Sequence, residues 1–261
     1  FAPKRVALSA WTAERTKWIE TFGHLKVVAA IGTPAQRLAA LHADADILTI
    51  NYENIPWLIE TLGDQWPFDT VFADESTRVA SVRVSLQTSK LGNEYMRSQG
   101  SKRANLLAKT AITKVRNWYN LTGSPAAGGL HNLWGQQFFL DQGKRLGRSF
   151  TAFEQRWFKR SIPGDIHSAL EAMPWAEQQI KDAIADCSIT IDARDWFPIE
   201  DVIERHVEID LPPKARTAYK EMAQGLYTAI LANDVEALNG AGKANKCRQI
   251  ASGQVFFEDG K

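Results

Sequence analysis

Two adjacent carboxylates, Asp74 and Glu75, stand directly after the apolar run from 68 to 73. Such a run is typical of a buried central strand, and the acids would then lie at its carboxyl end, where open α/β sheets bind ligands. An acid pair there suits nucleotide hydrolysis, because one carboxylate can hold Mg²⁺ through its water shell while the other orients or deprotonates the attacking water. Acid pairs are common, so a solvated turn is the alternative interpretation.

A second polar group, Thr122-Gly123-Ser124-Pro125, closes the strand-like segment from 116 to 121. If the sheet is parallel, these residues bring two hydroxyls and a tight turn to the same edge as the acids. Taken alone, the four residues are explained more simply as a plain loop with capping hydroxyls.

Short apolar runs alternate with helix-like stretches over the first half of the chain. Strands are predicted at 26–30, 45–50, 68–73 and 118–121, and helices at 12–22, 34–42, 55–62 and 102–113. Continuous apolar strands separated by helices predict an α/β fold, with a parallel sheet flanked by helices on both faces.

The pattern changes after Pro125, where the spacing of apolar residues favours amphipathic helices. Helices are predicted over 130–140, 150–158, 175–187 and 215–231, and strands only at 207–211 and 254–257. We therefore expect an α/β domain over 1–125, followed by a mainly α-helical extension over 126–261.

Length and composition exclude several classes of protein. The 261 residues are 44% hydrophobic and 23% charged, and no apolar run approaches the ~20 residues that a membrane span needs. The two cysteines, Cys187 and Cys247, can form neither a disulfide framework nor a four-ligand zinc site by themselves. A reducing, cytoplasmic setting is the expectation.

The near-zero net charge, 31 Lys and Arg against 30 Asp and Glu, conceals opposed blocks. From 78 to 116 there are nine basic residues and one acid, Glu94, whereas 165–210 holds twelve acidic and three basic residues. A cationic strip of this kind can bind a nucleic-acid backbone, although a solvated face is the simpler alternative. Within the strip, 82–100 shows no clear apolar period and is predicted to be a mobile loop.

These features, in this order, resemble the first motor lobe of Swi/Snf-type superfamily-two DNA helicases and translocases, particularly the phage-encoded branch. The resemblance extends over nearly the whole chain. Its segments are Ala2-Pro3-Lys4-Arg5-Val6 (motif Ia), Thr49-Ile50-Asn51-Tyr52-Glu53 (the Thr-Thr-Tyr-Glu element), Asp74-Glu75-Ser76-Thr77-Arg78 (motif II, or Walker B), Leu121-Thr122-Gly123-Ser124-Pro125 (motif III), Asp210-Leu211-Pro212-Pro213-Lys214 and Lys246-Cys247-Arg248-Gln249-Ile250.

The resemblance implies a partial RecA-like sheet and assigns roles to particular residues. Glu75 would be catalytic, and Asp74 would hold Mg²⁺ through water, so that both acids serve ATP. Thr122, Gly123 and Ser124 would couple nucleotide to movement. The phosphates of DNA would be contacted, without sequence readout, by Lys4, Arg5, Arg78, Lys102 and Arg103.

The departures from the family pattern matter as much as the matches. No G-x-x-x-x-G-K-[ST] phosphate loop occurs, and its nearest imitation, 240–244, is predicted to be a flexible turn. Thr77 stands where the family often has His, and Ala127 and Gly128 replace a Gln-Asn pair. In the family the phosphate loop precedes motif Ia and the arginine finger lies in the second lobe, so we expect this chain alone neither to bind ATP tightly nor to hydrolyse it.

Three functions remain open from the sequence. The first is a fragment of an ATP-dependent DNA translocase or helicase, completed by motor sequences in the same parent chain or in a partner subunit. The second is a non-catalytic nucleic-acid-binding or regulatory protein derived from a helicase lobe. The third is an unrelated α/β enzyme that uses Asp74 and Glu75 with a metal.

Overall fold

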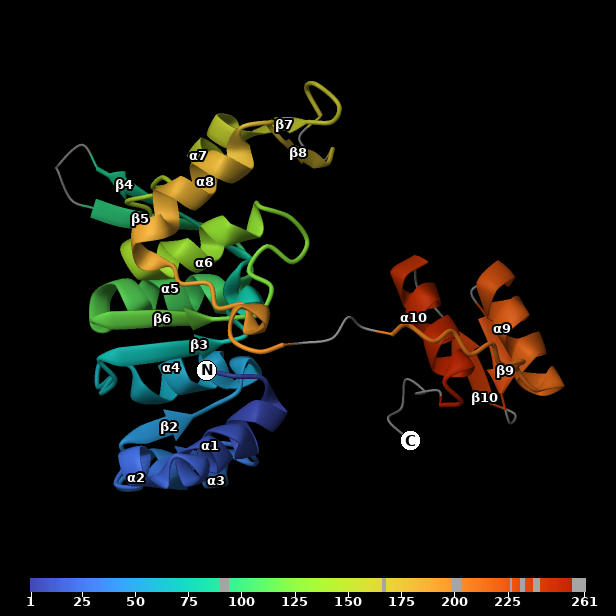
Figure 1. Ribbon diagram of the computed structural model, residues 1–261, viewed down its shortest axis with the longest axis horizontal. Coiled ribbons are helices and arrows are strands. Elements are labelled where there is room, and N and C mark those ends of the chain that lie inside the picture. The colour runs from blue at the N-terminus through green and yellow to red at the C-terminus, as the bar shows by residue number, and fades with distance from the viewer. Residues whose placement is uncertain are drawn as a thin grey trace. The chain divides into compact units, whose positions relative to one another are not determined.

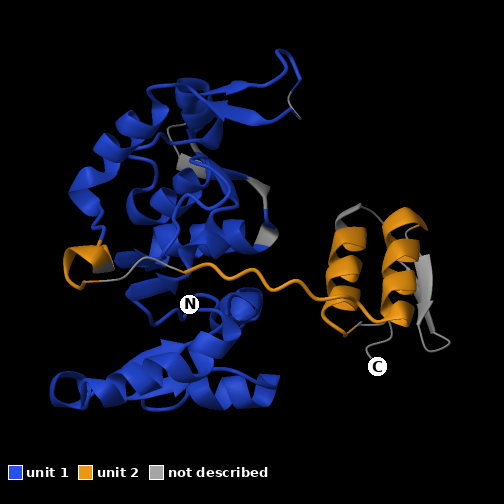
Figure 2. Cartoon of the chain, turned by 45° about the vertical axis from the view of Figure 1, so that its right-hand side comes forward, with its two compact units in different colours: residues 1–190 blue, residues 191–261 orange. Residues whose placement is uncertain are grey.

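The computed structural model describes residues 1–89, 94–165, 168–198, 203–225, 227–230, 233–236 and 240–254. The chain forms two compact units, Phe1–Thr190 and Ile191–Lys261 (Figure 2). The boundary expected near residue 125 differs from this division, because side chains from 126–190 pack into the same core as the sheet. Trp134, Phe138 and Trp157 share one buried cluster with Val71 of the sheet.

Parallel strands form the centre of unit 1 (Figure 1). β1 (Val27–Ala29) pairs with β2 (Ile47–Thr49), and β3 (Thr70–Asp74) pairs with β6 (Asn117–Leu121), both in parallel. The first two residues of the chain join the two pairs, because Ala2 forms a parallel bridge with Asn51 and the Phe1 nitrogen donates to the Phe72 carbonyl at 2.7 Å. All four strands lie within two residues of their predicted ends.

Three helices lie between these strands as the sequence predicts: α3 (Pro34–Leu41), α4 (Ile55–Leu62) and α5 (Lys102–Lys114). α3 begins at a capping box, in which the Thr33 hydroxyl accepts from the Gln36 backbone N–H and the Gln36 side chain accepts from the Thr33 N–H. The helix predicted over 12–22 starts earlier and is divided at Trp18. It comprises a π-helical segment η1 (Val6–Ala10), α1 (Trp11–Lys17) and α2 (Ile19–Phe22).

One face of β3 and β6 is buried and the other is half exposed. Val71, Ala73 and Trp118 belong to the main core cluster, and Trp118 stacks on Phe139 with ring centroids 4.4 Å apart. On the opposite face Phe72 and Tyr119 stack on each other at 4.9 Å and remain 40% and 49% exposed. Trp11 of α1 reaches this face, with its ring centroid 5.8 Å from that of Phe72. A helix therefore covers the face of these two strands only in part.

The mobile loop predicted over 82–100 is wrong. β4 (Val82–Thr88) and β5 (Glu94–Gly100) form an antiparallel hairpin whose register runs from Val82 opposite Gly100 to Thr88 opposite Glu94. Val82 and Val84 are buried in the main core, whereas the intervening Arg83 is not. This alternation is the period-two pattern of a half-buried strand.

From residue 126 onward unit 1 is mainly helical, as predicted. Its elements there are α6 (Asn132–Asp141), α7 (Phe150–Trp157), β7 (Phe158–Arg160), β8 (Leu170–Ala172), α8 (Ala176–Ile184) and η4 (Ala185–Cys187). Two short 3-10 helices, η2 (Tyr52–Asn54) and η3 (Ser76–Val79), follow β2 and β3. The buried Asp141 ties α6 to η4, because Arg145 donates to it at 3.0 Å and to Asp186 at 2.6 Å. Both cysteines are free.

Unit 2 contains η5 (Ala193–Asp195), α9 (Pro213–Gly225), the antiparallel pair β9 (Tyr227–Ile230) and β10 (Asn233–Glu236), and α10 (Gly240–Ala251). The helix predicted over 215–231 therefore ends early, and the turn predicted at 240–244 is wrong because these residues open α10. No strand forms at the predicted 207–211. Most of the strand predicted at 254–257 lies outside the described residues.

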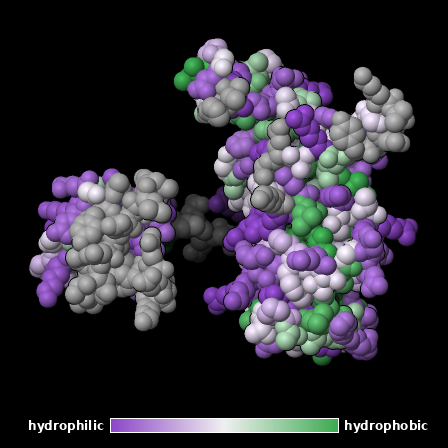
Figure 3. All heavy atoms as spheres, turned by 180° about the vertical axis from the view of Figure 1, so that it is seen from behind, coloured by the Kyte–Doolittle hydropathy of each residue, from purple (hydrophilic) through white to green (hydrophobic). Residues whose placement is uncertain are grey.

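Apolar side chains reach the surface of unit 1 in separate patches on a largely hydrophilic face (Figure 3). Trp18 and Ile19, which flank the break between α1 and α2, are 54% and 59% exposed. Among the described residues, no helix is both long and apolar enough to cross a lipid bilayer.

Candidate nucleotide and DNA-backbone site

The two polar segments predicted to share a sheet edge do so. In the register of β3 and β6, Asp74 lies opposite Leu121, so that Glu75 and Thr122 are the next residues of their chains beyond the sheet. The Thr122 hydroxyl accepts from the Ser124 backbone N–H at 3.3 Å, which closes the turn around Gly123. The structure therefore brings the acid pair and the Thr-Gly-Ser segment to the ends of adjacent parallel strands.

Glu75 has a left-handed backbone conformation, with φ 57° and ψ 54°. L-residues other than glycine, Asn and Asp rarely adopt this region, because Cβ approaches the following carbonyl. Strain of this kind concentrates at functional sites. It turns the chain sharply between β3 and η3 and leaves Glu75 exposed beside the half-buried Asp74.

We expect the free energy of unfolding of Glu75→Gly to exceed that of Glu75→Ala by about 1 kcal/mol, because glycine adopts the left-handed conformation without the Cβ penalty. Both variants remove the carboxylate, so their difference isolates the backbone strain. Urea unfolding of the two proteins measures it. Equal stabilities would show that Glu75 is not strained.

Tyr52 fixes the end of β3 relative to the end of β2. Its side chain is fully buried, and its hydroxyl donates to the Asp74 carbonyl at 2.7 Å. Burial, followed by the negative charges of Asp74 and Glu75, raises the pKa of Tyr52 well above its usual value. Tyr52 therefore stays protonated as a hydrogen-bond donor throughout the physiological range.

Gln136 of α6 connects the two polar segments, a role that the sequence did not reveal. Its buried side chain accepts from the Ser76 hydroxyl at 2.7 Å and donates to the Pro125 carbonyl at 2.7 Å. Its own carbonyl accepts from the Asn120 side chain at 2.9 Å. Gln136 therefore links the turn after Glu75 to the turn after β6.

Two of the predicted DNA contacts lie beside an acid. The Glu53 carboxylate is 3.9 Å from both the Arg78 and the Arg103 guanidinium groups. The Asn51 side chain donates a hydrogen bond to the Glu53 carboxylate at 2.7 Å. This hydrogen bond makes the largest contribution to lowering the pKa of Glu53, and the two arginines lower that pKa further. Lys102 is the first residue of α5, and its side chain lies outside the described residues.

A third predicted contact, Lys4, lines a polar cavity of about 400 Å³ at the carboxyl ends of β1 and β2. Arg37 lines the same cavity, and its Nε is buried with no hydrogen-bond partner among the described residues. The remaining lining residues are Ile31, Gly32, Thr33, Gln36, Asn51 and Asn54. Arg5 follows Lys4 and is exposed. Two cations with several neutral donors make this cavity suitable for a phosphate group.

The residues at the sheet edge fit Mg²⁺ better than they fit a complete nucleotide. Mg²⁺ usually keeps several of its waters and takes only one or two carboxylates, and Asp74 can supply one of them. Among the described residues, no group of three or more His, Cys, Asp or Glu is arranged to hold a metal ion. A triphosphate also needs a cradle of backbone N–H groups with a lysine, and the sequence has no such loop.

No family model matches the chain. The chain is similar to protein p41 of Acyrthosiphon pisum secondary endosymbiont phage 1, with 42% identity over 262 residues. The aligned region covers 100% of this chain and 54% of p41, so the chain spans about half the length of the curated relative that it matches. The name p41 states no activity.

Proposed function

We propose that this chain is part of the first lobe of an ATP-dependent DNA translocase or helicase of the Swi/Snf type. The observation that carries the proposal is the pairing of β3 with β6, which sets Asp74-Glu75 beside Thr122-Gly123-Ser124 at one sheet edge. In the resemblance drawn from the sequence, these two segments are the Walker B box and motif III.

In this function Asp74 and Glu75 have different roles. Asp74 would hold Mg²⁺ through its water shell, and Glu75 would orient or deprotonate the water that attacks a nucleotide phosphate. The exposure of Glu75 leaves its carboxylate free to meet a nucleotide held by other motor sequences. Gln136 transmits a change at Ser76 to the Pro125 carbonyl, because both are hydrogen-bonded to one rigid, buried side chain.

DNA is the proposed polymer on which the motor acts. Lys4 and Arg37 around the polar cavity, together with Arg78 and Arg103 beside Glu53, give a row of cations at the carboxyl ends of β1, β2 and β3. Contacts from such groups to backbone phosphates give affinity and register without sequence readout. Glu53 would hold the two arginines in position while the duplex is absent.

The purified chain should show no Mg²⁺-dependent ATP hydrolysis above background, because the acid pair lacks a phosphate loop and an arginine finger. A coupled phosphate-release assay measures the rate, with the Glu75→Gln variant as the matched control. A Mg²⁺-dependent rate that Glu75→Gln abolishes would overturn this expectation.

The alternative function is a nucleic-acid-binding protein that does no ATP chemistry, and one observation favours it. The Lys4 and Arg37 cavity needs no nucleotide to bind a phosphate. The two functions are distinguished by Glu75→Gln in the longest natural protein that contains this chain. Loss of a DNA-stimulated ATPase supports the motor, whereas absence of any ATPase in the wild-type protein supports the binding protein.

A further inference from the structure

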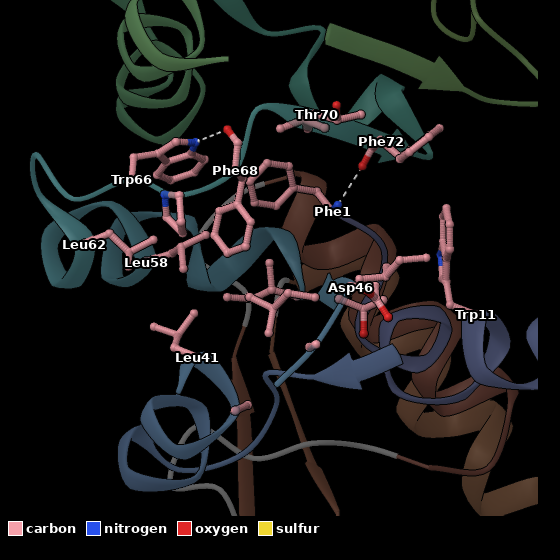
Figure 4. Close-up of a pocket in the computed structure, with 18 of the residues that line it drawn as sticks. Phe1, Trp11, Leu41, Asp46, Leu58, Leu62, Trp66, Phe68, Thr70 and Phe72 are labelled. Carbon is pink, nitrogen blue, oxygen red and sulfur yellow. Dashed lines mark hydrogen bonds between the residues drawn. The ribbon is translucent and has the colours of Figure 1, made fainter. Parts of the chain in front are cut away.

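A cavity of about 620 Å³ lies in unit 1 between β2 and β3, and its walls are mostly apolar, with Leu58 and Trp66 among them (Figure 4). Among the described residues that line it, the charged side chains are the acids Asp46 and Asp69. The polar cavity that Lys4 lines, at the carboxyl ends of β1 and β2, has the opposite character. Anions are therefore favoured at that edge of the sheet and not in the larger cavity.

An acid, Glu53 of η2, lies between two arginines at the same edge. Its Oε1 atom is 3.9 Å from a guanidinium nitrogen of Arg78, in η3, and 3.9 Å from a guanidinium nitrogen of Arg103, in α5. Charge-assisted hydrogen bonds from arginine to a carboxylate are about 2.7–2.9 Å long. Both arginines are therefore attracted to Glu53 without donating a hydrogen bond to it.

The guanidinium donors of these two arginines are not engaged elsewhere in the part of the chain that the structure describes. Among the described residues, neither the Arg78 nor the Arg103 side chain donates a hydrogen bond, and the Nε atom of Arg103 is buried without a partner. A buried donor without a partner costs free energy unless water or a ligand satisfies it. The pair of arginines can therefore donate to an anion that reaches both of them.

Asn51 holds Glu53 in its place between the arginines. The Asn51 amide nitrogen donates to Glu53 Oε2 at 2.7 Å, and the Asn51 amide oxygen accepts from the Asn54 side chain at 2.6 Å. Asn51 is buried, whereas the Glu53 side chain is 56% exposed. The carboxylate is therefore fixed through one oxygen only, and its other oxygen can be displaced toward solvent.

Two further acids lie in the neighbourhood of the arginines. Burial is the largest cause of the raised pKa of Tyr52; Asp74 and Glu75 raise that pKa further, whereas Arg78 and Arg103 lower it, so all four charges act on the Tyr52 hydroxyl. Among the described residues, neither Asp74 nor Glu75 forms an ion pair with either arginine. Glu53 is therefore the acid that competes directly with a ligand for this pair of cations.

We propose that Glu53 is a displaceable counter-ion, which in the free protein occupies the place that a phosphate of a nucleic-acid backbone takes between Arg78 and Arg103. The inference rests on the proposed binding of DNA at these strand ends and adds its regulation. A backbone phosphate has two non-bridging oxygens, one for each guanidinium group, whereas Glu53 offers a single oxygen to both. The arriving phosphate displaces this oxygen, and the cost of displacing it lowers the affinity of the free protein for its ligand.

The proposal is tested with Glu53→Gln, which keeps the size of the side chain and an oxygen that can accept from Asn51 but removes the charge. The probe is inorganic pyrophosphate, titrated by calorimetry at low salt concentration. We expect Glu53→Gln to bind pyrophosphate about tenfold more tightly than wild type, because the competing charge is gone. Glu60→Gln, which removes an exposed acid of α4, is the matched control and should bind as wild type does.

Addition of Arg103→Ala to Glu53→Gln should abolish the gain. A gain that survives Arg103→Ala, a gain of equal size in Glu60→Gln, or equal affinities of Glu53→Gln and wild type would each overturn the proposal.

Duplex DNA separates a failure of this inference from a failure of the proposed function. We expect Glu53→Gln to bind duplex DNA more tightly than wild type, with a salt slope steeper by up to ~0.9, the contribution of one phosphate contact. A gain with pyrophosphate but no binding of DNA by any variant would support the counter-ion and contradict the DNA function. Salt-dependent DNA binding that Lys4→Ala/Arg37→Ala weakens, but that Glu53→Gln leaves unchanged, would support the DNA function and overturn the counter-ion.

Discussion

Replacing Gln136 with alanine should lower the free energy of unfolding by about 2 to 3 kcal/mol. The substitution removes the partner of the Ser76 hydroxyl, which is fully buried, and the donor to the Pro125 carbonyl. A buried polar group left without a partner costs ~1–3 kcal/mol, and the missing side chain adds a cavity. The effect should be large because Gln136 is itself only 4% exposed.

A double-mutant cycle, followed by urea unfolding, measures the coupling free energy between Gln136 and Ser76. Once Ser76→Ala has removed the orphaned hydroxyl, Gln136→Ala should cost at least 1 kcal/mol less than in the wild-type background. Gln178→Ala on the exposed surface of α8 is the control and should change stability by less than ~0.5 kcal/mol. Additive costs for Gln136 and Ser76 would show that the two side chains are not coupled.

Gly135→Ala should destabilise unit 1 by about 2 kcal/mol, although alanine favours a helix over glycine. A Cβ at Gly135 would lie 2.3 Å from the Ala80 carbonyl oxygen and 3.0 Å from Val82 Cγ1. Overpacking against backbone costs ~1–3 kcal/mol, which exceeds the ~1 kcal/mol gain in helix propensity. Relief of the clash would move α6, and with it Gln136, away from the turn after Glu75.

The matched substitution for Gly135→Ala is Gly225→Ala at the last residue of α9. A Cβ at Gly225 meets no atom within 4 Å. This variant should therefore be neutral or slightly more stable, whereas the Gly135 variant loses stability in thermal and urea unfolding. A Gly135→Ala protein as stable as wild type would mean that α6 does not pack against Ala80 as described.

The order and type of elements in the first half of unit 1 could be predicted because each follows a local pattern. The four strands are apolar runs, and the α4 helix has the bounds 55–62 that its apolar spacing predicts. The β4–β5 hairpin was missed although Val82, Val84 and Leu86 alternate with polar residues. Its many Ser, Gln and Asn side chains obscured that period-two signal.

The parts of the candidate site that depend on tertiary contacts could not be predicted. Asp74, Glu75 and the Thr122 turn could be predicted because they follow strands. The parallel register of β3 and β6 then brings them to the same edge of the sheet. No local sequence pattern distinguishes Gln136 from other helical glutamines. Its role depends on the tertiary contacts with Ser76 and Pro125. Arg37 was missed in the same way: it lies in a predicted helix, and only folding brings it to the cavity that Lys4 lines.

The left-handed conformation of Glu75 is also invisible in the sequence. Glycine or asparagine would have indicated the turn, whereas glutamate adopts the left-handed conformation here against its usual preference. An acidic side chain held at a strained position between β3 and η3 agrees with a chemical role for Glu75.

If the carboxyl ends of β1, β2 and β3 bind the DNA backbone, the affinity for duplex DNA should depend strongly on salt concentration. The logarithm of the association constant should fall linearly with the logarithm of salt concentration. Lys4→Ala/Arg37→Ala and Lys102→Ala/Arg103→Ala should each weaken binding and reduce the slope by about 1.8, because each phosphate contact contributes ~0.9. Lys159→Ala/Lys181→Ala, which removes two exposed cations on β7 and α8, should change neither quantity. Unaltered affinity and slope in both site variants, or binding that does not depend on salt, would contradict binding of the DNA backbone at these strand ends.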